Sequence, residues 1–296
     1  MKNKNILIFS AKILATILLF YYVNKNLDFS QVSKMGNLGL VFFIAITFAF
    51  LQQFFLFLRW YFSLKTLNVS ESKKSVLKSY LIGQFLGTVT PARSGDLAKV
   101  FYLENTNKKQ GTYAVILDGA VAILTLLIIS YVIFILNVSS FLSKSLDYFD
   151  ESMLNIVGIF LNVIAVIPIV AIIVILTLSK TELSATFWRN FAKLFGVSLL
   201  QYTILLMQSA LIFSVILPFS VWDAFASSAY AYFIMLFIPV IASIGAREYA
   251  FTFAFSAQSY EATIFAASYI LLLCNSVIFM LPGIYLFYRT KSPQSP

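Results

Sequence analysis

The sequence has no histidine, a single cysteine and few charges, which make up 11% of its 296 residues. Without histidine, the chain cannot form a His-based metal site, a histidine proton shuttle, or a Ser-His or Cys-His nucleophile pair. The lone Cys274 cannot form a disulfide within the chain. These absences weigh against an autonomous enzyme without excluding one, and we expect neither a metal nor a cofactor.

Hydrophobic residues make up 60% of the chain, and its charged fraction of 11% is less than half of the roughly 25% found in soluble domains. This composition predicts an all-α polytopic membrane protein, with no nucleic-acid partner and one integral membrane domain over residues 1–296. A helix needs about 20 residues to cross the hydrocarbon core, and six runs are long enough. They are Ile6–Val23, Leu38–Leu58, Tyr113–Leu136, Leu154–Leu178, Phe191–Leu217 and Thr263–Phe287. The first reads as an uncleaved span rather than a signal peptide.

Two shorter runs, Val76–Val89 and Ala224–Ala242, end in similar segments, Thr90–Asp96 and Pro239–Glu248. Each segment combines a proline, small residues, a glycine, an arginine and a carboxylate. The first run would form a helix of roughly 21 Å, which is too short to span comfortably. Charged groups within apolar sequence are costly and usually functional.

The distribution of lysine and arginine favours hairpins over crossings for both short runs. With eight crossings, the positive charges divide 9 inside to 10 outside; with two re-entrant hairpins they divide 14 to 3. Because positive residues collect in cytoplasmic loops, we expect six spans, two helical hairpins and cytoplasmic termini. The inside group includes Arg59, Lys99 and Lys108–Lys109, and Asp147–Glu151 falls outside.

This topology divides the eight hydrophobic segments into two pseudo-repeat halves, residues 1–137 and 154–287. Each half has two spans, a hairpin and a further span, and an odd number of crossings inverts one half relative to the other. Inverted repeats with broken helices near the midplane are typical of secondary transporters. We therefore expect the two segments to face each other across a hydrated cavity.

The chemistry of the two segments suits an anion. Gly95 and Gly245 permit sharp turns, Asp96 can cap the returning arm Leu97–Leu103, and Glu248 lies in the first turn of the next helix. Helix N-termini present free N–H groups to an anion.

Arg93 and Arg247 add guanidinium groups that can hold a phosphate in bidentate fashion. Asp96 and Glu248 would orient these arginines while the site is empty. The alternative is that the arginines and carboxylates form structural ion pairs only.

Asp118 is a further candidate, within the span that follows the first hairpin. It could pair with Lys99 or Lys78, carry a proton, or sit near the cytoplasmic end of its helix without a function. Polar residues elsewhere in the spans are expected to hydrogen-bond neighbouring helices. These are Gln84, Gln201, Gln208 and Asn275.

Several segments together resemble the lysylphosphatidylglycerol synthase transmembrane, or flippase-like, family. They are Arg59-Trp60, Tyr80–Phe85, Thr90–Asp96, Ala114–Asp118, Pro239 and Gly245–Glu248. The resemblance implies a prokaryotic plasma-membrane protein that handles lipids with anionic or modified headgroups. Many relatives have an arginine after the acidic residue at 118, where this chain has Gly119. Because Pro296 lies nine residues beyond Phe287, we expect a stand-alone member without an aminoacyl-transferase domain.

We therefore expect a plasma-membrane transporter rather than an enzyme, which binds or translocates an anionic, phosphate-bearing lipid between leaflets. The alternative is a membrane enzyme or accessory subunit that acts on a phospholipid or polyprenyl-phosphate with a separate transferase. A scaffold without a substrate would leave the charges at membrane depth unexplained.

Overall fold

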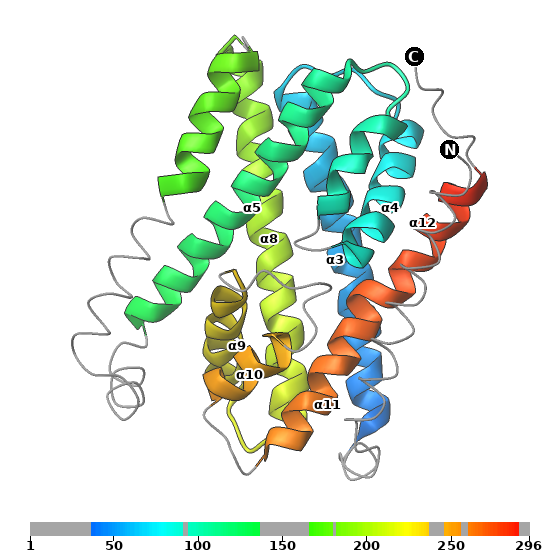
Figure 1. Cartoon of the computed structure of the whole chain (residues 1–296). Coiled ribbons are helices and arrows are strands. Elements are labelled where there is room, and N and C mark those ends of the chain that lie inside the picture. The colour runs from blue at the N-terminus through cyan, green and yellow to red at the C-terminus, as the bar shows by residue number, and fades with distance from the viewer. Residues whose placement is uncertain are drawn as a thin grey trace.

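The computed structural model describes residues 37–90, 94–136, 166–179, 182–236, 246–255 and 260–289, and within them regular structure is entirely helical. This confirms the all-α prediction (Figure 1). The elements are α3 (Leu38–Thr66), α4 (Lys73–Val89), the 3-10 helix η1 (Ser94–Tyr102), α5 (Lys108–Leu136), the Val166–Ser179 helix, α8 (Ala185–Ile216), α9 (Val221–Met235), α10 (Ala246–Phe255), α11 (Glu261–Leu272), the π-helix η3 (Leu273–Val277) and α12 (Ile278–Arg289).

Four helices are long and apolar enough to cross a membrane: Leu38–Thr66, Lys108–Leu136, Ala185–Ile216 and Ala262–Arg289. They correspond to four of the six predicted spans. Of the other two, Ile6–Val23 lies outside the described residues, and the Val166–Ser179 helix covers the end of Leu154–Leu178.

Three helices, α4, α8 and α9, begin directly after a serine that caps their first turn. The Oγ atoms of Ser72, Ser184 and Ser220 each accept a hydrogen bond from a backbone N–H three residues later, at 3.1, 3.3 and 3.1 Å. Each bond satisfies one of the N–H groups that a helix leaves free at its start.

The helices α4 and η1 form an antiparallel pair. A Cβ added to Gly87 would lie 2.7 Å from Asp96 Oδ1, and one added to Gly83 would lie 2.2 Å from Lys99 Cγ. The glycines therefore let η1 pack directly on α4, and the chain returns to the end of the bundle from which α4 started (Figure 1).

Glu71, just before α4, binds the segment that follows η1. Its Oε1 accepts hydrogen bonds from the backbone N–H of Asn105 at 2.7 Å and from the Thr106 hydroxyl at 2.6 Å. Burial raises the pKa of the Glu71 carboxyl, but hydrogen bonds from Thr106, Ser75 and the backbone outweigh it, so the pKa lies below its usual 4.5.

Replacing Glu71 by glutamine should therefore cost more stability at neutral pH than in acid. A lowered folded-state pKa gives stabilisation that is present above about pH 4.5 and lost as the pH falls through the folded-state value. We expect Glu71→Gln to lower the free energy of unfolding by about 1 kcal/mol at pH 7, with a smaller difference at pH 3.5. Thermal melts of detergent-solubilised protein test this; Glu104→Gln, whose side chain is 57% exposed, should behave like wild type.

The helices α9 and α10 form a second antiparallel pair. The rings of Tyr232 and Phe251 have centroids 5.5 Å apart, and those of Phe219 and Phe255 are 5.4 Å apart. This pair lies in the lower half of the bundle in Figure 1, whereas α4 and η1 lie in the upper half.

Positive charge is concentrated at the upper end of Figure 1, where α3 and α12 finish and α4, α5 and α8 begin. We call this the basic end. The lysines and arginines in these helix termini are Lys65, Lys73, Lys74, Lys108, Lys109, Arg189, Lys193 and Arg289. The helix termini at the lower end contain neither lysine nor arginine among the described residues.

The last span contacts both antiparallel pairs. In α11, Ser268 donates a hydrogen bond of 3.0 Å to Glu248 of α10. In α12, Gly283 lies so close to α4 that an added Cβ would be 2.2 Å from the Leu81 carbonyl oxygen. Between the two lies η3, a short π-helix of the kind that often marks functional sites.

Candidate functional site

A buried ion pair joins α3 to α5. Arg59 Nε lies 2.8 Å from Asp118 Oδ1, and Arg59 Nη2 donates to Asp118 Oδ2 at 3.3 Å. The third guanidinium nitrogen, Nη1, donates to Gln201 of α8 at 3.0 Å. The side chains are only 11% and 6% exposed, so the planar fork of the arginine satisfies a carboxylate that water hardly reaches.

Lys99 of η1 completes this cluster. Its Nζ lies 3.5 Å from Asp96 Oδ1 and 4.0 Å from Asp118 Oδ2, and it stands 5.4 Å from the Trp60 ring centroid. Two cations and two carboxylates therefore lie together, and all but the 24% exposed Asp96 are buried. We call this group the charge cluster: Arg59, Asp118, Lys99 and Asp96.

Two cations of the charge cluster lie elsewhere than the sequence predicted. Arg59 and Lys99 were predicted among the cytoplasmic loop residues, but both are buried within the helical bundle. They can lie there because each is close to a carboxylate, and a paired charge avoids much of the cost of burial. Asp118 does lie near Lys99 as one alternative proposed, whereas Lys78 pairs with Glu104 at 3.7 Å.

Gly95 lies at the start of η1 and is needed for close packing. An added Cβ would lie 2.2 Å from the Leu86 carbonyl oxygen, and the Gly95 N–H donates to Thr90 Oγ1 at 2.7 Å. The next residue, Asp96, occupies the first turn of η1, which begins at Ser94 rather than at the predicted Leu97. Arg93, which precedes this turn, lies outside the described residues.

Arg247 begins the second helix of the α9/α10 pair. It is 9% exposed, and its Nε and Nη1 atoms are buried without a hydrogen-bond partner in the described part of the chain. Glu248 is fully buried and accepts the hydrogen bond from Ser268. In the part of the chain that the structure describes, no ion pair joins Arg247 to Glu248, and the hydrogen bond from Ser268 links α10 to α11. Gly245 lies outside the described residues.

Further polar atoms of the α9/α10 pair are also buried without a partner among the described residues. They are Ser228 Oγ of α9 and Thr252 Oγ1 of α10. Tyr232 lies within electrostatic range of Arg247, and its hydroxyl is 3.2 Å from Ser209 Oγ of α8. Because native proteins pair almost all buried polar groups, these atoms mark the α9/α10 pair as a candidate polar site.

An amide network joins α3 and α8 to the π-helix η3. Gln208 Nε2 donates to Asn275 Oδ1 at 3.0 Å and to the Ala45 carbonyl at 2.7 Å, and Gln52 donates to Gln208. Gln53 Nε2 donates to the Asn275 carbonyl at 2.8 Å. The predicted interhelical hydrogen bonds of Gln208 and Asn275 are confirmed here, and that of Gln201 by its bond to Arg59.

The structure thus brings the predicted residues together in two groups. Asp96 and Asp118 meet through Lys99, near the basic end, and Arg247 and Glu248 lie in the pair at the other half of the bundle. Arg59 and Lys99 were missed as site residues.

A family model described as "Lysylphosphatidylglycerol synthase TM region" matches residues 8–283. The chain belongs to this family. The family description and the four apolar helices long enough to cross a membrane together indicate a membrane protein that is involved in phospholipid handling. Comparison with curated proteins and with solved structures gives no match.

Proposed function

We propose that this member of the lysylphosphatidylglycerol synthase TM family binds the phosphate of an anionic membrane lipid through Arg247 and moves the lipid between leaflets. The observation that carries the proposal is the buried Arg247 guanidinium, two of whose nitrogens have no hydrogen-bond partner among the described residues. A buried charge without a partner costs several kcal/mol, about 3–5 when one member of a pair is removed. An anion that enters the site would recover this energy, and a phosphate oxygen matches the guanidinium geometry.

The arrangement of the helices supports a transport role. The basic end would face the cytoplasm, together with both termini, in the plasma membrane. The helices of the two antiparallel pairs, α4/η1 and α9/α10, are short. They have 17 residues in α4, nine in η1, 15 in α9 and ten in α10. Even the longest would be roughly 26 Å, less than a hydrocarbon core of about 30 Å. We propose that both pairs are re-entrant hairpins that enter from opposite sides, as in an inverted repeat.

Alternating access follows from this proposal. In the sequence, Arg93 falls between α4 and η1, and Arg247 is the second residue of α10. We propose that Arg93 is the second phosphate ligand and that each conformation opens one hairpin tip to water while the other is sealed. Gly95 and Gly245 would serve as the turning points, and Asp118 would hold α5 to α3 through Arg59.

Transbilayer movement is tested in proteoliposomes with fluorescent phosphatidylglycerol and phosphatidylcholine that share the same acyl chains. Reduction of the outer-leaflet dye reports how fast the inner-leaflet lipid becomes accessible. We expect purified protein to accelerate phosphatidylglycerol movement and to have a much smaller effect on phosphatidylcholine. Rates equal to those of protein-free vesicles for both lipids would contradict transport.

A second candidate function is supported by the family description, which names a synthase. In that case the protein is an accessory subunit that presents a phospholipid or polyprenyl-phosphate to a separate transferase at the cytoplasmic face. The charge cluster near the basic end favours it, because Lys99 and Arg59 lie close to that face. Binding of phosphatidylglycerol without transbilayer movement would favour this candidate over the first.

A further inference from the structure

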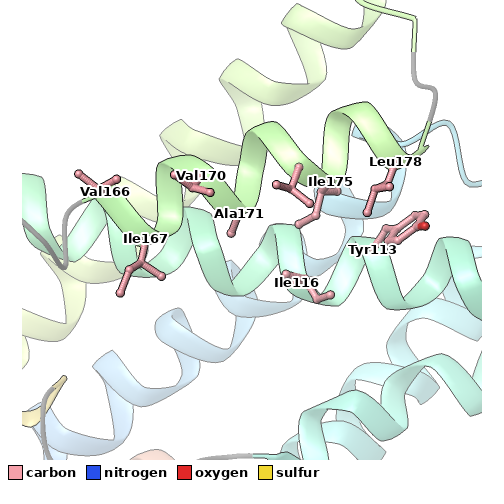
Figure 2. Close-up of a pocket in the computed structure, with 9 residues that line it drawn as sticks. Tyr113, Ile116, Val166, Ile167, Val170, Ala171, Ile175 and Leu178 are labelled. Carbon is pink, nitrogen blue, oxygen red and sulfur yellow. The ribbon is translucent and has the colours of Figure 1, made fainter.

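An apolar groove runs between α5 and the Val166–Ser179 helix, with a volume of about 640 Å³. Figure 2 shows Val166 and Ile167 at one end and Leu178 beside Tyr113 at the other. Apart from the aromatic Tyr113, the lining side chains are aliphatic. The groove is separate from Arg247 and from the charge cluster, and no predicted site residue lines it.

The dimensions of the groove suit one lipid chain. From Val166 to Leu178 the helix rises by roughly 18 Å, close to half of a hydrocarbon core of about 30 Å. A docked helix of that length would occupy roughly 1,400 Å³ for a diameter of about 10 Å. The groove volume is smaller than this, which favours a single acyl chain over a helix from a second copy as the occupant.

One end of the groove carries positive charge. The Val166–Ser179 helix ends, and α5 begins, at the basic end (Figure 1). Lys109 of α5 is exposed, and its Nζ lies 5.9 Å from the ring centroid of Tyr113. An acyl chain in the groove would therefore leave its headgroup beside an ammonium group, at the level where lysines attract anionic lipids.

The geometry points to a binding site for one anionic phospholipid of the leaflet at the basic end, with an acyl chain in the groove and its headgroup phosphate on Lys109. This site is independent of the proposed role of Arg247. It holds a lipid at the outer surface of the bundle.

The test measures how much phosphatidylglycerol and phosphatidylcholine detergent-purified protein retains, by native mass spectrometry after addition of each lipid. We expect Lys109→Gln to lower phosphatidylglycerol retention about fivefold, the effect of about 1 kcal/mol for a lysine near an anionic headgroup. Ala171→Phe, which fills the middle of the groove, should remove the tightly held lipid.

Matched controls separate the groove from general effects. Lys108→Gln removes a neighbouring cation that stacks on Phe101 rather than on Tyr113, and Ala262→Phe adds the same bulk to an exposed position of α11. Both should retain lipid like wild type. The same comparisons on an Arg247→Gln background separate lipid held in the groove from lipid held at the proposed central site.

Unchanged phosphatidylglycerol retention in Lys109→Gln and Ala171→Phe would overturn the proposal. Equal retention of phosphatidylcholine by wild type would do the same, because it removes the role of the charge. A shift of wild-type dimers to monomers in Ala171→Phe would show that a second copy occupies this face and would also overturn it.

Discussion

Arg59→Ala is expected to lower the free energy of unfolding by about 3–5 kcal/mol, the usual cost of removing one partner of a buried ion pair. The substitution removes two hydrogen bonds to Asp118 and leaves that carboxylate buried, with Lys99 4.0 Å away as its remaining ion-pair contact in the described structure. It also leaves Gln201 without its hydrogen bond from Arg59. Thermal or denaturant unfolding in detergent, followed by circular dichroism, measures the loss.

Two further variants make this prediction specific. Lys78→Ala removes a more exposed ion pair, in which Lys78 and Glu104 side chains are 29% and 57% exposed, and should cost at most about 1 kcal/mol. The double variant Arg59→Leu/Asp118→Leu should recover most of the loss, because no unpaired charge remains from this pair. If Arg59→Ala is as stable as wild type, the ion pair does not hold α3 to α5.

Arg247→Ala is expected to weaken binding of phosphatidylglycerol at least tenfold while leaving the lipid-free protein at least as stable as wild type. A hydrogen bond to a charged group contributes about 1.5–3 kcal/mol, which corresponds to tenfold or more in affinity. Stability should not fall, because Arg247 Nε and Nη1 have no hydrogen-bond partner to lose in the described structure. The two buried arginines thus give opposite expectations for stability.

Binding of short-chain phosphatidylglycerol in detergent, measured by calorimetry beside a thermal melt, tests both parts. Arg247→Lys should restore binding only partly, because an ammonium group lacks the planar bidentate geometry. Arg289→Ala, at the exposed end of α12, is the matched control and should bind like wild type. A destabilised Arg247→Ala protein with normal lipid binding would make Arg247 a structural residue.

The spans could be predicted from sequence because a membrane requires a fixed length of apolar helix. The first antiparallel pair was signalled by an apolar run too short to cross, followed by Pro91. The π-helix η3 had no comparable signal, because its extra residue is accommodated by the amide network around Asn275 rather than by local sequence.

Arg59 was misassigned because it follows the hydrophobic run Leu38–Leu58 and resembles a loop cation. The helix continues to Thr66, and its buried polar residues recur at helical spacing. They include Gln52, Arg59, Ser63 and Thr66. This stripe could have indicated a buried polar face. The distances from Asp118 to Arg59 and Lys99 could not be predicted, since they depend on how α3, α5 and η1 pack.

Contact between a lipid phosphate and Arg247 can be measured by solid-state NMR. The protein would carry nitrogen-15 arginine in phosphatidylglycerol bilayers, on an Arg93→Lys/Arg189→Lys/Arg289→Lys background that removes the second proposed ligand and the arginines at the basic end. A phosphate that accepts hydrogen bonds from Arg247 predicts a phosphorus–nitrogen dipolar contact that disappears in Arg247→Lys. Absence of this contact, or a contact unchanged by Arg247→Lys, would contradict the binding of an anionic lipid at Arg247.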